Sequence, residues 1–144
     1  NLDCCENKLF SLNISRNPSL SSLHCDSNRL RSLEVSSCTA LSYFSCVDNR
    51  MSELDVSNNK SLQYLYCSDN FLTELDVSGN LYLASLYCGF NRITNLDVSN
   101  NTLLKELNCT GNQLTTLDVT NLADLERLFC SGNQLLKLDI SNNE

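Results

Sequence analysis

The sequence lacks the segments that would place a chain in a membrane. No run approaches the roughly 18 consecutive apolar residues that a membrane span requires, and the first residues contain no basic segment followed by an apolar one. We therefore expect no direct membrane insertion, and we expect no signal peptide within this chain.

Basic residues are also scarce. Lys and Arg together number 10 against 17 Asp and Glu, so the formal net charge is -7 and the sequence pI is about 4.6. Nucleic acids and anionic membrane surfaces attract clustered positive charge. Neither is therefore an expected partner.

A helical pattern of apolar residues is missing as well. No stripe at the i, i+3, i+4, i+7 positions is long enough to predict a helix. The length of 144 residues and a hydrophobic fraction of 42% suit one folded unit with a core. These features predict a single domain with little or no helix.

The cysteines reveal an internal repeat. Seven of the nine recur every 21 residues without insertion or deletion, each is followed three residues later by Asn, and a leucine column keeps the same period. Such a period has to be explained before any other pattern. The cysteine column comprises Cys4, Cys25, Cys46, Cys67, Cys88, Cys109 and Cys130; the leucine column comprises Leu12, Leu33, Leu54, Leu75, Leu96, Leu117 and Leu138.

Each repeat has two similar halves. The unit reads LxxLxCxxNxLTxLDVSxNxx, as in residues 62–82, and both LxCxxN and LDVSxN place Asn three residues after a small apolar residue. Alternation over Leu-x-Cys and Leu-Asp-Val predicts short strands with the Leu, Cys and Val pointing inward. Asn near Gly or Ser then turns the chain. Such short strands require the stacking of coil on coil for stability.

This unit resembles the signature segment of leucine-rich-repeat proteins, and its 21-residue form is similar to the bacterial subclass called IRREKO. The resemblance covers essentially the whole chain. It implies a mainly β solenoid of about seven coils, with a parallel sheet on the first-strand face and a short second strand or a turn in the LDVSxN half. It also implies a binding role, often at a bacterial cell surface. The departures are Phe44, Met51 and Ile93 at Leu positions, and Cys38 and Leu122 at Asn positions.

The cysteine column is predicted to be structural. Stacked strands lie about 4.8 Å apart with parallel side chains, whereas the Cβ atoms of a disulfide lie roughly 3.5 to 4.5 Å apart and face each other. A zinc site would show clustered spacings such as C-x-x-C, which the 21-residue interval does not provide. We expect a column of small buried thiols and no metal.

The two asparagine columns also have a structural interpretation. A buried amide can donate to and accept from backbone groups of its own and the adjacent coil. The glycosylation sequons at Asn13, Asn59, Asn100 and Asn108 follow from the abundance of Asn and Ser in the repeat, and a glycan would not fit at Asn59. We expect these sequons to be coincidental.

An acidic column follows the second-half leucines. Its carboxylates would repel one another by roughly 0.8 kcal/mol per neighbour at about 5 Å in water, so each needs a partner. Hydrogen bonds from nearby Ser or backbone amide groups are the first explanation. A cation between carboxylates, giving a calcium-dependent binder, is the alternative, although no GGxGxD calcium repeat is present. The column comprises Glu34, Asp55, Asp76, Asp97, Asp118 and Asp139.

Aromatic side chains occupy outward positions of the first strand in the middle coils. Tyr and Arg are favoured at interface hot spots, and the fold itself does not require such rings on its surface. The alternative is cross-strand ring stacking that only stabilises the sheet. The predicted partner-binding residues are Tyr43, Tyr64, Tyr66, Tyr87, Phe90, Phe129, Arg127 and His24.

One trio superficially resembles a catalytic site. Cys5, His24 and Asp26 are predicted to point outward from the same face of adjacent coils. However, Asp26 beside Cys5 would disfavour a thiolate, His24 is diagonal to it, and an open sheet offers no oxyanion donors. We expect no enzyme activity, no catalytic residue and no cofactor.

The sequence thus favours a non-catalytic module that binds a protein or a glycan through the aromatic first-strand face. A structural spacer that assembles end to end is the alternative, because residues 1 and 144 both fall inside a repeat and no capping segment is visible. Residues 1–144 are predicted to be one leucine-rich-repeat domain and a fragment of a larger protein. The resemblance implies an extracellular or cell-surface location and a role such as adhesion.

Overall fold

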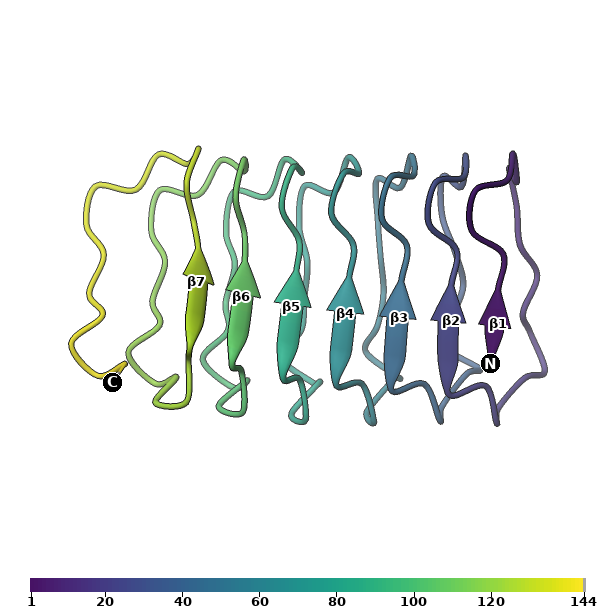
Figure 1. Cartoon of the computed structure of the whole chain (residues 1–144), viewed down its shortest axis with the longest axis horizontal. Helices are drawn as coiled ribbons and strands as arrows, with labels where there is room; N and C mark the ends of the chain where they lie inside the picture. Colours follow the sequence, from purple (N-terminus) through teal and green to yellow (C-terminus); the bar gives the residue numbers. More distant parts are fainter. Residues whose placement is uncertain (144) are drawn as a thin grey trace.

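The computed structural model describes residues 1–143. Seven short strands form one parallel sheet in chain order, and each strand pairs with the strand 21 residues further on (Figure 1). The two ends of the chain lie at opposite ends of this stack. The strands are β1 (Leu2–Asp3), β2 (Ser22–His24), β3 (Tyr43–Ser45), β4 (Tyr64–Tyr66), β5 (Ser85–Tyr87), β6 (Glu106–Asn108) and β7 (Arg127–Phe129).

The core consists of the regular columns. The central Leu of each inner strand, the Cys two residues later and the Val of the LDV segment are buried along the inner coils, and Phe44 takes the Leu position of β3 without exposure. All nine cysteines are free, as the column geometry predicts. Burial of these columns requires neighbouring coils, so stability depends on stacking.

The second half of each described coil contains no strand. The sequence allowed a short strand or a turn there, and the structure shows the turn. The carbonyl groups of Val35 and Cys38 accept hydrogen bonds from the Asn59 side chain of the next coil, and each also accepts a backbone amide of its own turn. Side-chain amides therefore join the coils on this side and backbone ladders join them on the other.

The first asparagine column connects neighbouring coils as expected. The Asn70 amide donates to the carbonyls of Cys46, Cys67 and Ser68, and its oxygen accepts from the Met51 amide at 2.9 Å. The same pattern recurs at the equivalent positions of neighbouring coils. Each such side-chain oxygen satisfies a backbone amide of the preceding coil that the turn would otherwise leave unpaired.

The second asparagine column is less fully satisfied. The Asn80 amide donates to Val56 and Asn59 carbonyls at 3.0 Å each, but its side-chain oxygen has no hydrogen-bond partner, as is also true for Asn59, Asn101 and Asn143. Asn59 is fully buried, which confirms that its sequon could not carry a glycan in this fold.

A turn column with positive φ follows each first strand. Its members are mostly polar or Gly, but Phe90 adopts φ 53° there, and its ring lies against Gly111 of the next coil. Positive φ is a strained conformation for a bulky residue. The turn therefore tolerates Phe90 only beside a residue without a side chain.

Replacing Gly111 with Ala should destabilise the protein by about 1 to 3 kcal/mol, since φ there is +67° and the added Cβ would lie 2.8 Å from a Phe90 ring carbon. Gly79→Ala is the matched control, because its Cβ would meet only the mobile end of Lys60 and φ is not positive. Urea denaturation should show a change below about 0.5 kcal/mol for the control. Equal losses of stability in the two variants would show that the positive φ of Gly111 and its contact with Phe90 do not matter for stability.

Two further features complete the fold. In the last described coil, Leu136 is 91% exposed and Ile140 is 57% exposed, so apolar side chains remain uncovered there. Within residues 1–143 no helix is long and apolar enough to cross a membrane.

Candidate binding surfaces

The strand face is the outward side of the seven-stranded sheet, and its middle carries the predicted aromatic cluster. His24 stacks on Tyr43 with ring centroids 4.5 Å apart. Tyr43 contacts Tyr64 at 5.9 Å and Tyr66 edge-on at 5.4 Å, and Tyr66 contacts Tyr87 edge-on at 5.1 Å. Five of the eight predicted residues therefore form one continuous group across β2 to β5.

The cluster continues toward the C-terminal strands through Glu106. The Tyr87 hydroxyl donates to Glu106 at 3.0 Å, and Arg127 donates to the other carboxylate oxygen at 2.7 Å. Phe129 lies beyond them on β7 and is 47% exposed. Glu106 is not among the residues predicted from the sequence, although its charge is opposite to that of Arg127 one coil later, which indicates this contact.

Phe90 lies outside this group. It occupies the turn after β5, where its ring covers Gly111 and remains 58% exposed. Near the same edge of the sheet, Arg92 lies over the ring of Phe71 at 4.9 Å. The predicted set is thus divided between the strand face and its turn edge.

Small polar residues lie beneath the rings. Ser45 and Ser85 face outward in sequence but are buried by their neighbours. The Ser45 hydroxyl donates to Asp26 at 2.6 Å, and the same carboxylate oxygen accepts from the Val47 amide at 2.7 Å. The Ser85 hydroxyl has no partner. The rings therefore cover a polar layer rather than the apolar core.

The trio that resembled a catalytic site has no activated nucleophile. The Asp26 backbone amide donates to the Cys5 sulfur at 3.3 Å. Burial, followed by hydrogen bonding to Asp3, raises the pKa of Cys5 to about 11. The His24 ring stacks on Tyr43 and is hydrogen-bonded to Ser22. A thiol with this pKa is protonated at neutral pH and does not act as a nucleophile.

The opposite side of the solenoid carries the acidic column, and the predicted hydrogen bonds are present. The backbone amide of the Ser or Thr two residues later donates to each carboxylate at 2.8 to 3.0 Å. Hydrogen bonds from the side chain and backbone of these same residues lower the pKa of the carboxyl groups of Glu34, Asp55, Asp76, Asp97, Asp118 and Asp139.

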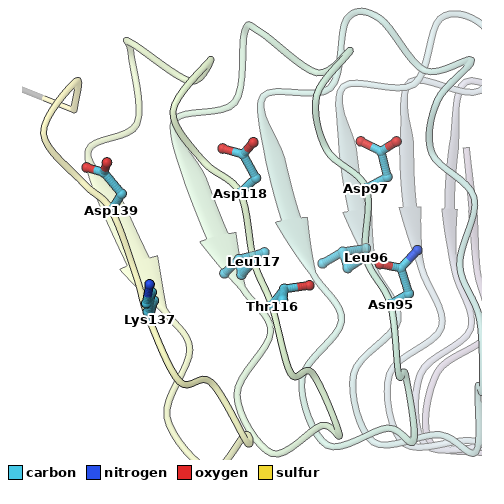
Figure 2. Close-up of a pocket in the computed structure, with 8 residues that line it drawn as sticks. All are labelled: Asn95, Leu96, Asp97, Thr116, Leu117, Asp118, Lys137 and Asp139. Atoms are coloured by element: carbon cyan, nitrogen blue, oxygen red, sulfur yellow. The ribbon is translucent and has the colours of Figure 1, made fainter.

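A groove runs along this side, which the sequence did not reveal. We call it the back-face groove: an N-terminal part of about 1020 Å³ reaches from Glu53 to Asp97, and a C-terminal part of about 400 Å³ reaches from Asn95 to Asp139. Figure 2 shows Asp97, Asp118 and Asp139 in one row, Asn95, Thr116 and Lys137 in a second, and Leu96 and Leu117 between them.

The carboxylates of the back-face groove do not gather around a point. Among residues 1–143 no group of three His, Cys, Asp or Glu side chains is arranged to hold a metal ion. The acids instead follow one another along the groove at one coil each.

A solenoid in which every coil contributes one short parallel strand, with buried Leu, Cys and Asn columns, defines the leucine-rich-repeat class, and the chain has the leucine-rich-repeat fold. It is similar to the functional domain of InlJ from Listeria monocytogenes, which includes a cysteine ladder: identity is 40% over 96% of this chain, with a TM-score of 0.76. A leucine-rich-repeat protein of Leptospira interrogans is 25% identical over 96% of this chain, with a TM-score of 0.90.

The fold also occurs in a plant peptide hormone receptor in complex with RGF2, which is 22% identical over 79% of this chain and 21% of that chain, with a TM-score of 0.70. The chain spans 36% of the InlJ domain and 38% of the Leptospira protein. No protein-family model matches the chain, and no curated protein sequence matches it.

Proposed function

We propose that the chain is a non-catalytic recognition module of a bacterial secreted or cell-surface protein, and that it binds a protein partner through the strand face. Its similarity to the functional domain of a Listeria protein supports a binding role. The observation that carries the proposal is the continuous cluster of His24, Tyr43, Tyr64, Tyr66 and Tyr87 on a surface that the core does not need.

The chemistry of this cluster suits a protein surface. Tyr side chains offer a large rigid area with little conformational entropy to lose, and a hydroxyl at the end. Tyr64 is 40% exposed, while the edge-on contacts of Tyr66 hold its ring in place. The cross-strand ring contacts that would stabilise the sheet are present. In this proposal, the same contacts also hold the rings in place for binding. A glycan ligand, end-to-end self-association and membership of the 21-residue subclass stay predictions.

The Tyr64→Ala, Tyr66→Ala double variant should bind its partner at least about ten-fold more weakly, because hot-spot truncations typically cost more than 1 kcal/mol. Immobilised chain would first capture a partner from bacterial or host surface extracts, and surface plasmon resonance would then compare purified variants. Tyr82→Ala is the matched control, because Tyr82 is 61% exposed but lies in no strand and outside the cluster. Equal affinities of both variants and the wild type would refute the assignment.

A further inference from the structure

The back-face groove combines two properties that arise independently. Its floor is apolar, since Leu54, Leu75, Leu96 and Leu117 line it. These four leucines are 4 to 9% exposed, so each offers only an edge to the groove. The two parts of the groove share Asn95 and Asp97, and the coils that line them repeat at about 4.8 Å. The groove is therefore long, shallow and regular.

One wall is acidic along the whole groove, and the other is acidic only in its N-terminal part, before Asn95, Thr116 and Lys137. The acidic column forms one wall, and Glu53 and Glu74 belong to the other. Counting Glu34, this side carries eight of the chain's 17 acidic side chains. Lys137 lines the C-terminal end, and Lys60 lies close enough to Asp76 to lower the pKa of its carboxyl group. With the two lysines counted, this side has an excess charge of -6, close to the net charge of the whole chain, -7.

These carboxylates are fixed but not neutralised. One oxygen of each acidic-column side chain accepts a backbone amide, which sets its direction. The two ion pairs of the described residues, Lys105 with Glu126 and Arg127 with Glu106, involve none of them. A preorganised row of like charges attracts an oppositely charged partner without further ordering.

We propose that the back-face groove binds an extended cationic polypeptide segment. Lys and Arg side chains combine an aliphatic stem with a charged end. Their stems fit against the leucine floor, and their charges reach the carboxylates of both walls. An extended segment of about six residues, at about 3.3 Å each, spans the four intervals of about 4.8 Å between the coils that line the groove. The occupant therefore carries several cationic side chains along one strand-like stretch.

The proposal can be tested with a fluorescently labelled octa-arginine peptide, with octa-glutamate as the peptide control. Fluorescence anisotropy at low ionic strength should show saturable binding of octa-arginine alone, and its affinity should fall at least ten-fold between 20 and about 200 mM salt as the charges become screened. The Asp76→Asn, Asp97→Asn double variant should reduce the affinity about ten-fold or more. Asn retains the oxygen that accepts the Ser78 and Ser99 amides, so the fold should persist.

Asp48→Asn with Asp69→Asn changes the net charge by the same amount on the turn edge, where both residues have positive φ. This control should retain the affinity within about two-fold, as should Tyr66→Ala on the strand face. If both double variants lose affinity equally, the peptide senses only the overall charge and the groove assignment is wrong. If Tyr66→Ala alone weakens binding, the cationic segment belongs to the strand face instead.

Discussion

Raising the pH above 9 should unfold the protein over a narrow interval in the presence of a reducing agent. Burial raises the pKa of Cys25, Cys46, Cys67, Cys88 and Cys109 above the ordinary value of 9.0, to about 12 for Cys67 and Cys109. These thiols stay protonated in the folded chain and ionise in the unfolded chain. The unfolded state therefore binds fewer protons above pH 9, and stability decreases as the pH rises.

The magnitude follows from the number of thiols. Each contributes full stabilisation below pH 9 and loses about 1.4 kcal/mol per pH unit above it until its folded pKa is reached. Five thiols together can remove about 7 kcal/mol per pH unit. Because the stability of a domain is commonly about 5 to 15 kcal/mol, the chain should unfold between about pH 10 and 11.

Urea denaturation at several pH values between 8 and 10.5, followed by circular dichroism, would measure this slope. The Cys67→Ala variant should be less stable at pH 8 by about 1 kcal/mol because of the cavity. Its slope above pH 9 should be smaller by about 1.4 kcal/mol per pH unit, the value for one proton. A stability that does not change between pH 8 and 10.5, or an unchanged slope in the variant, would show that the cysteine column does not cause unfolding at high pH.

The repeat columns explain how far the fold could be predicted. A period of 21 residues without interruption places the same residue type at the same point of every coil, so the stacking of coils and the buried Cys and Val columns follow from the sequence, while the parallel sheet is what the family resemblance implies. The partners of the acidic column could also be predicted, because a Ser or Thr follows each acid by two residues.

The second half of the coil shows where this reasoning fails. Leu-Asp-Val alternates just as Leu-x-Cys does, so the pattern alone cannot separate a strand from a turn. Whether this half forms a strand or a turn depends on which group of the next coil donates a hydrogen bond to the Val35 carbonyl. The donor from the next coil is the Asn59 side chain, and the backbone amide that bonds to this carbonyl is that of Cys38 in the same turn; this arrangement depends on distances between coils.

The back-face groove could not be predicted for a related reason. Glu53 and Asp55 are two residues apart, and their separation across the coil surface is not evident from a column-by-column reading. Leu54 lies between them in the sequence, and the leucine column predicts that its side chain is buried in the core. The structure shows that this leucine also lines a groove. Residues that are nearly buried can thus shape a groove on the surface, and the spacing of apolar residues in the sequence does not indicate that groove.

Replacing Asn70 with Leu should destabilise the protein by about 3 to 5 kcal/mol and lower its melting temperature by about 10 °C. Leu retains the branched shape of the side chain but removes four hydrogen bonds, at 2.9 to 3.3 Å, in a buried turn. The buried Met51 amide would remain without an acceptor, which costs more than its bond contributes, while each of the three carbonyl groups would lose one donor and keep another. Asn7→Leu is the control, since Asn7 is exposed and bonds only within its own coil.

The location of Asn70 adds a second signature. Its bonds to Cys46 and Met51 cross to the preceding coil, and the stability of a solenoid is approximately a sum of coil energies and nearest-neighbour interface energies. Weakening one interface should therefore separate the coils before it from those after it. Thermal unfolding of Asn70→Leu should become broader or biphasic, whereas Asn7→Leu, at the end of the stack, should shift by less than about 1 kcal/mol in one transition. A single sharp transition in both variants would mean that the asparagine column does not control cooperativity between coils.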